Sequence, residues 1–135
     1  HDLKTITPDS REQVIPLDHY RRNVRALLTA LQEHTHAKLI WATTTLVIDQ
    51  RFRDQYNNGA DVGFLRYNED VLAYNDAARQ ICGDLNIPVN DLYAVVKDAG
   101  PEKIMEDDGI HFLNEGSAVL AAAVVAAVVA AVQNV

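Results

Sequence analysis

The feature that most constrains the fold is the alternation along the chain of helical apolar spacing with short, strand-like apolar runs. Apolar residues recur at helical spacing from Leu17 to about His34, which predicts an amphipathic helix. Lys38 to Val47 is short, β-branched and largely apolar, as a covered parallel strand is. Helical spacing returns from Phe64 to Leu85, and Ile87 to Val89 begins a second strand. Such alternation predicts parallel strands joined by crossover helices, an α/β fold.

The segments between these elements are predicted from their turn-forming residues. Asp49 to Gly63 is polar and contains an Asn-Asn-Gly sequence, so we expect a loop. Asp91 to Val96 predicts a helical turn, and Gly100-Pro101 predicts a break in the chain. Asp107 to Asn114 predicts a polar loop before the last helix.

The last helix is marked by an uninterrupted apolar run. Ala118 to Val132 holds 15 residues, almost all Ala and Val, whereas a bilayer-spanning helix needs about 20. Small side chains also let a helix approach a sheet closely. We therefore expect this helix to be buried against the sheet and to lie outside any membrane.

Two strands are too few for a stable sheet, since isolated pairs are marginal in water. The chain begins with His1 rather than Met, which agrees with further strands being encoded upstream. We therefore expect residues 1–135 to be the C-terminal part of a single domain whose N-terminal strands lie outside this chain.

Composition narrows the function classes. The net charge is −7, which argues against a nucleic-acid surface, because phosphate binding needs clustered Lys and Arg. The single cysteine, Cys82, excludes an internal disulfide. A glycine-rich phosphate loop is absent from the sequence, which disfavours a nucleotide-binding doubly wound domain.

The stretch that carries chemistry is Asp107-Asp108-Gly109-Ile110-His111-Phe112-Leu113-Asn114. Its Asp-x-x-His spacing, in a loop before a C-terminal apolar helix, resembles the last block of the SGNH hydrolases, a family of GDSL-like lipases and esterases. The resemblance implies that His111 is the general base and that Asp108 orients it, while Asp107 has the wrong spacing. We therefore expect Asp108 within hydrogen-bond reach of one ring nitrogen of His111, with the other ring nitrogen facing a cleft. A histidine suits this role because it changes charge near neutral pH, and Gly109 allows a tight turn.

A second, shorter similarity lies at the start of the chain. The third block of SGNH hydrolases has the form Gly-x-Asn-Asp, and His1-Asp2 is similar to its end, with His in the place of Asn. Because an imidazole can donate a hydrogen bond, His1 is a candidate donor to the oxyanion. A purely structural role for His1 and Asp2 is an equal alternative.

The resemblance implies a three-layer α/β/α sandwich with a parallel sheet, of the SGNH or flavodoxin-like type. It implies a serine ester hydrolase that acts on small acyl esters, acetyl groups on carbohydrate among them, without a metal or other cofactor. The family's serine lies in an upstream Gly-Asp-Ser block, which this sequence lacks. We therefore expect His111 and Asp108 to need an upstream segment that contains the serine.

Other reactive residues have simpler interpretations. The two serines, Ser10 and Ser117, are expected in a polar loop and a helix start, and Cys82 in the core. His34 and His36 follow a helix end, where they are expected to be solvated rather than to bind a metal. Thr43, Thr44 and Thr45 either line a substrate pocket or only favour a strand. A non-catalytic fragment or interaction module with a vestigial Asp–His pair remains the alternative function.

Overall fold

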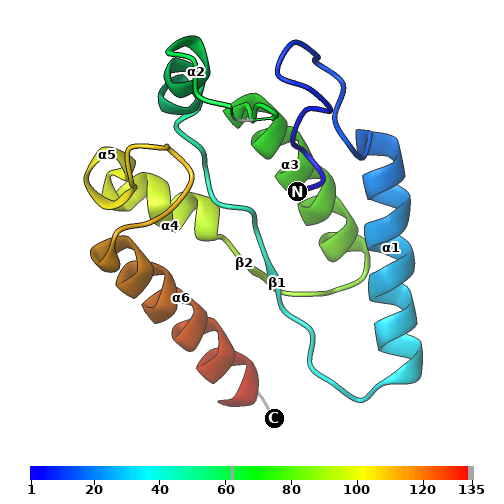
Figure 1. The fold of residues 1–135 in the computed structure, drawn as a ribbon. Helices are drawn as coiled ribbons and strands as arrows, with labels where there is room; N and C mark the ends of the chain where they lie inside the picture. The colour runs from blue at the N-terminus through cyan, green and yellow to red at the C-terminus, as the bar shows by residue number, and fades with distance from the viewer. Residues whose placement is uncertain (62, 134–135) are drawn as a thin grey trace.

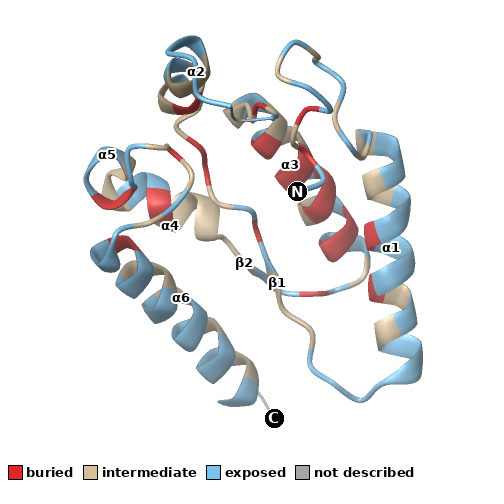
Figure 2. Ribbon diagram, viewed as in Figure 1, coloured by how far each residue is buried: buried red, intermediate tan, exposed pale blue. Residues whose placement is uncertain are grey.

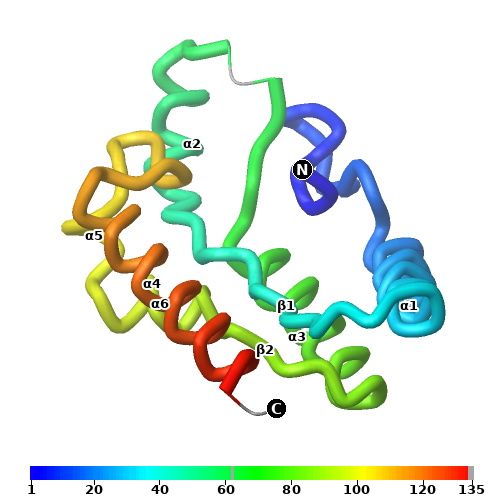
Figure 3. The backbone as a smooth tube through the Cα atoms, turned by 90° about the horizontal axis from the view of Figure 1, so that it is seen from below, coloured from blue at the N-terminus to red at the C-terminus, as the bar shows by residue number. Residues whose placement is uncertain are grey.

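The chain folds into six helices around a short parallel strand pair in its computed structural model, which describes residues 1–61 and 63–133 (Figure 1). Helices α1 and α3 lie on one side of the strands, and α4 and α6 lie on the other (Figure 3). In chain order the elements are α1 (Leu17–His34), β1 (Trp41–Ala42), α2 (Asp49–Asn57), α3 (Asn68–Asp84), β2 (Val89–Asn90), α4 (Leu92–Ala99), α5 (Pro101–Ile104) and α6 (Asn114–Gln133).

The strand pair is parallel, as the alternation predicted, but shorter than expected. Trp41 pairs with Val89 and Ala42 with Asn90. The N–H of Thr43 continues the ladder by donating to the carbonyl of Asn90 at 3.0 Å. Apart from Trp41, Ala42 and this one bond from Thr43, the predicted strand Lys38 to Val47 does not pair with another strand in the described part of the chain. The observed strand is therefore shorter than the predicted one. The fold is thus α/β with a two-stranded parallel sheet.

Apolar side chains form a core on each side of the strands. On one side, α1 and α3 enclose a buried cluster made of Val24, Leu28, Ile81, Cys82 and Ile87. On the other side, Leu46, Val96, Ile104 and Met105 form a second buried cluster beneath α4 and α5. The predicted core position of Cys82 is confirmed, because the residue is fully buried.

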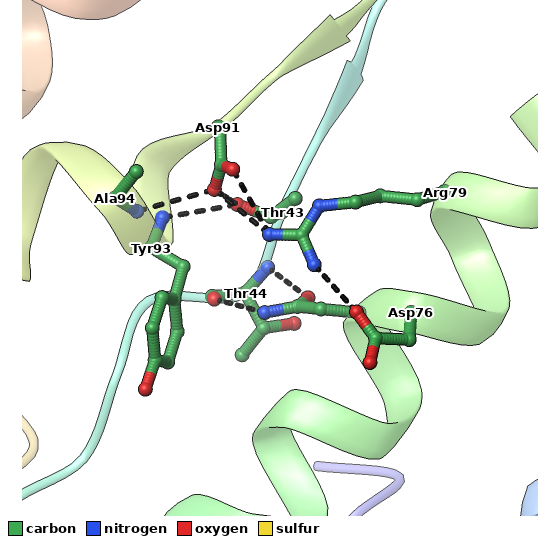
Figure 4. A network of polar contacts seen from close by, with 8 residues as sticks. Thr43, Thr44, Asp76, Arg79, Asp91, Tyr93 and Ala94 are labelled. Atoms are coloured by element: carbon green, nitrogen blue, oxygen red, sulfur yellow. Dashed lines mark hydrogen bonds and ion pairs between the residues drawn. The ribbon is translucent and has the colours of Figure 1, made fainter.

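A side-chain amide takes the place of a missing strand neighbour beyond β1. Asn75, on α3, is 1% exposed. Its Oδ1 accepts from the N–H of Thr44 at 2.9 Å, and its Nδ2 donates to the carbonyl of Thr44 at 2.8 Å (Figure 4). These two bonds satisfy both backbone groups of Thr44 and hold the extended chain after β1 against α3.

Asp91 joins β1, α3 and α4 at one point (Figure 4). Its carboxylate accepts from the N–H of Ala94 at the start of α4 and from both the Thr43 hydroxyl and the Arg79 guanidinium. Burial raises the pKa of Asp91, but these bonds outweigh it and hold the pKa below its usual value. Thr43 therefore has a structural role. For this one of the three threonines, the structure favours that role over lining a substrate pocket.

Replacing Asn75 with alanine should lower the free energy of unfolding by about 1 to 3 kcal/mol, because the two hydrogen bonds between its side chain and the backbone of Thr44 would be lost. Urea denaturation of the natural polypeptide that contains this chain would measure the loss. Asn57→Ala is the matched control, since Asn57 is exposed at the end of α2. Equal stability of the two variants would contradict this role for Asn75.

The predicted loop from Asp49 to Gly63 is wrong over its first part, where the chain forms α2. Side-chain bonds one turn apart, from Gln50 to Asp54 and from Arg53 to Asp49, stabilise this helix. Phe52 anchors it and is 7% exposed. Val62, inside the predicted loop, lies outside the described residues.

Helix α6 forms as predicted, but its predicted burial against the sheet is wrong. It packs on α4, α5 and the end of β2, and its outer surface is exposed (Figure 2). Val125 is 61% exposed and Val132 is 63% exposed, while Gly116 is its one buried residue among those described. By length and composition α6 could cross a membrane, as could many core helices of soluble proteins, which are mostly buried.

Candidate active site

A tight loop between α5 and α6 holds the predicted Asp–His pair. Met105 and Phe112 pair as an antiparallel bridge at its base. Within the loop, the N–H of Glu106 donates to the carbonyl of His111 at 2.9 Å, and the N–H of Gly109 donates to the carbonyl of Glu106 at 3.0 Å. These bonds close the loop on itself and fix residues 106 to 111 relative to one another.

Gly109 lets the loop dock against the chain that follows β1. Its φ is +72°, and a Cβ atom there would lie 2.4 Å from the carbonyl oxygen of Ile48. Glycine alone fits such a close approach in this conformation. The N–H of Ile48 donates to the carbonyl of Gly109 at 2.8 Å, so the loop is tied to the start of α2.

Arg51, on α2, supports the same loop from below. Its guanidinium donates to the carbonyls of Met105 and Glu106 at 3.2 and 3.0 Å. It also forms an ion pair with Glu102 at 2.6 Å. Sequence analysis missed this support, because the segment that carries Arg51 was predicted to be a loop rather than a helix.

Asp108 is oriented by the backbone of its own loop. Its Oδ1 accepts from the N–H groups of Ile110 and His111 at 2.8 and 2.9 Å. Burial raises the pKa of Asp108, but these two N–H groups and the His111 ring outweigh that effect and hold the pKa below its usual value. The carboxylate is therefore charged at neutral pH and fixed in direction.

The predicted contact between Asp108 and His111 is present: Asp108 Oδ2 lies within hydrogen-bond distance of His111 Nδ1. A carboxylate on Nδ1 selects the tautomer that leaves Nε2 able to accept a proton. The His111 side chain is 73% exposed. The ring therefore faces solvent, whereas we expected Nε2 to face a cleft.

A cavity of about 350 Å³ lies beside the loop, with Ile110 in its wall. His1 and Asp2 also line it, as do Thr44 and Thr45 from the chain after β1. Ligands in α/β folds bind beyond the carboxyl ends of the strands, which is where these threonines lie. The structure thus places His1 and Asp2 in the wall of a cavity that Ile110, the neighbour of His111, also lines. Among the described residues, neither His1 nor Asp2 forms a side-chain hydrogen bond or ion pair with Asp108 or His111.

Arg66 also lines this cavity, and sequence analysis missed it. It precedes α3 and is half-buried. Burial lowers the pKa of Arg66, and the nearby charge of Asp108 acts in the opposite direction. A lone arginine between a polar loop and a helix has no distinguishing pattern in one sequence, so only the folded chain reveals it.

None of the remaining candidate side chains is hydrogen-bonded to His111 among the described residues. The Oγ of Ser10 accepts from the N–H of Glu12 at 2.9 Å in the N-terminal loop, and Ser117 is exposed in the first turn of α6. His34 and His36 are exposed. Within residues 1–61 and 63–133, His, Cys, Asp and Glu side chains do not gather in any group of three that could hold a metal ion.

Comparison with known proteins relates the chain to esterases. The isoamyl acetate-hydrolyzing esterase of Saccharomyces cerevisiae is 23% identical over 106 residues, which cover 77% of this chain and 44% of that protein. The crystal structure of the lipase/acylhydrolase from Enterococcus faecalis matches with a TM-score of 0.66 and 22% identity, over 91% of this chain and 55% of that one. At this low sequence identity, the two similarities support a relationship to the SGNH hydrolases.

The SGNH relationship rests on the fold and on this distant sequence similarity. Searched against models of protein families, the sequence matches none. The chain spans about half the length of each of these two proteins. The predicted SGNH resemblance is confirmed, and the roles of His111, Asp108, His1 and Asp2 remain predictions.

Proposed function

We propose that this chain supplies the base and its orienting carboxylate to an SGNH-type serine ester hydrolase. The observation that carries the proposal is the contact of Asp108 with Nδ1 of His111, in a loop whose backbone fixes the carboxylate. The two similar proteins are named as an esterase and a lipase/acylhydrolase, which supports the same reaction class.

In the proposed mechanism, His111 Nε2 accepts the proton of a serine hydroxyl as that oxygen attacks the ester carbonyl. Asp108 stabilises the imidazolium that results. His111 then returns the proton to the leaving alcohol, and an acyl-enzyme remains. Water, activated by the same base, releases the acid. His1, in the neighbouring cavity wall, is the proposed side-chain donor to the oxyanion.

The serine is proposed to come from a segment outside these 135 residues, on strands that complete a three-layer α/β/α sandwich. Two features support this arrangement. One edge of β1 is not paired with another strand in the described residues. Trp41, which belongs to β1, lines the cavity, and its indole N–H is buried without a hydrogen-bond partner among the described residues. A buried donor of this kind favours further chain or ligand beside β1.

The proposed substrate is a small acyl ester, with carbohydrate acetates as one candidate class. The natural polypeptide that contains this chain should release acid from 4-nitrophenyl esters, and comparison of acetate with octanoate would give the preferred acyl length. Acetylated xylan would test the carbohydrate class. Failure to hydrolyse any of these esters, by folded protein, would contradict the proposal and favour a non-catalytic module with a vestigial Asp–His pair.

A further inference from the structure

Arg66 lies in the wall of the cavity beside the Asp–His loop, with its hydrogen-bonding capacity unused. Among the residues that the structure describes, its guanidinium makes no hydrogen bond or ion pair, and it lies 5.0 Å from the centre of the Phe64 ring. An arginine carries five N–H donors in a planar fork and stays charged in proteins. A half-buried fork without acceptors is suited to an anionic ligand.

The nearest catalytic carboxylate does not satisfy this arginine. Asp108 is close enough for its charge to act on Arg66, but Asp108 Oδ1 already accepts two backbone N–H groups and Oδ2 contacts His111. Asp2 also lines the cavity, yet it forms no ion pair with Arg66 in the described part of the chain. The donors of Arg66 are therefore available to a molecule in the cavity.

Arg66 lies in the same cavity wall as the residue next to the proposed base, His111. The cavity wall joins Arg66 to Ile110, the residue before His111, and to Thr44 and Thr45. We propose that Arg66 binds a carboxylate carried by the ester substrate, so that the enzyme prefers anionic esters over neutral ones. This inference rests on the proposed ester hydrolase function and adds the charge class of the substrate.

Two aryl acetates of similar size, one with a para carboxylate and one with a neutral para carboxamide, provide the test. The natural polypeptide should hydrolyse 4-acetoxybenzoate with a higher kcat/KM than 4-acetoxybenzamide. Arg66→Gln should lower this preference by about 10- to 100-fold, as expected for a hydrogen bond to a charged group. Arg66→Lys keeps the charge without the fork and should retain an intermediate preference. Arg22→Gln makes the same change of net charge on an exposed part of α1 and is the matched control.

Binding of the product separates this inference from the proposed function. Calorimetric titration with 4-hydroxybenzoate should show binding to the wild-type protein and to Arg22→Gln, and a loss of at least tenfold in Arg66→Gln. Binding without any hydrolysis would support the Arg66 site and contradict the esterase. Hydrolysis with equal preference for the two esters in wild type and Arg66→Gln would overturn the inference, as would the absence of 4-hydroxybenzoate binding.

Discussion

His111→Ala should lower kcat for ester hydrolysis by about 10⁴- to 10⁶-fold in the natural polypeptide that contains this chain. A serine hydroxyl is a poor nucleophile until a base removes its proton, and removal of the histidine from such a triad has effects of this size. Asp108 already contacts Nδ1, so the ring is positioned to use Nε2. Steady-state rates with 4-nitrophenyl acetate would measure the loss.

Two further variants separate a catalytic role from a structural one. His36→Ala removes another exposed histidine and should leave the rate within about twofold of wild type. Asp108→Asn should cost about 10² to 10⁴ in kcat. The asparagine oxygen can still accept from the N–H groups of Ile110 and His111, so the loop should keep its shape, but its NH₂ favours the wrong tautomer of the ring. Wild-type turnover in His111→Ala would refute the assignment.

The helices that sequence analysis located best are those with one apolar face. The predicted helix from Leu17 to about His34 is confirmed as α1, because Val24 and Leu28 occupy one stripe that packs on α3. The second helix was predicted from Phe64 but begins at Asn68. The preceding Leu65 is instead held by Thr5, whose N–H donates to the carbonyl of Leu65 at 2.9 Å. Such a contact between distant segments leaves no local pattern.

The errors have the same physical origin in long-range packing. Helix α2 is highly polar, and burial of Phe52 against the rest of the fold is not visible in its sequence. The run Ala118 to Val132 suggested burial on all sides, but its neighbours in the structure cover one side only (Figure 2). An apolar pattern records how much surface a helix can bury, whereas the neighbouring elements determine which part is covered.

The candidate site divides in the same way. Asp108 and His111 are three residues apart, so a single tight turn decides their contact, and the motif could predict it. The cavity is lined by residues from five separate parts of the sequence: residues 1–3, Tyr20, residues 41–47, residues 66–74 and Ile110. Neither Arg66 nor the bonds between Asn75 and Thr44 could be predicted without knowing which segments become neighbours.

A fluorophosphonate probe should not label the isolated 135-residue chain. The probe reacts with serines whose hydroxyl is activated by a base. Ser10 lies in the N-terminal loop, where its oxygen accepts from the N–H of Glu12, and Ser117 is exposed in the first turn of α6. Neither hydroxyl is hydrogen-bonded to His111 in the described structure. A base without a nucleophile can activate water at best, and the acyl-enzyme step that divides the barrier is lost.

The natural polypeptide, or the chain together with a partner segment that bears the serine, should instead take up one probe molecule per protein. Peptide mapping should place the label in an upstream Gly-Asp-Ser sequence, and His111→Ala should abolish it. Circular dichroism should be used to check that the isolated chain is folded, because a sheet of only two strands is expected to fold poorly. If Ser10 or Ser117 became stoichiometrically labelled in the isolated, folded chain, the nucleophile would lie within these 135 residues and the proposed division of the triad would be wrong.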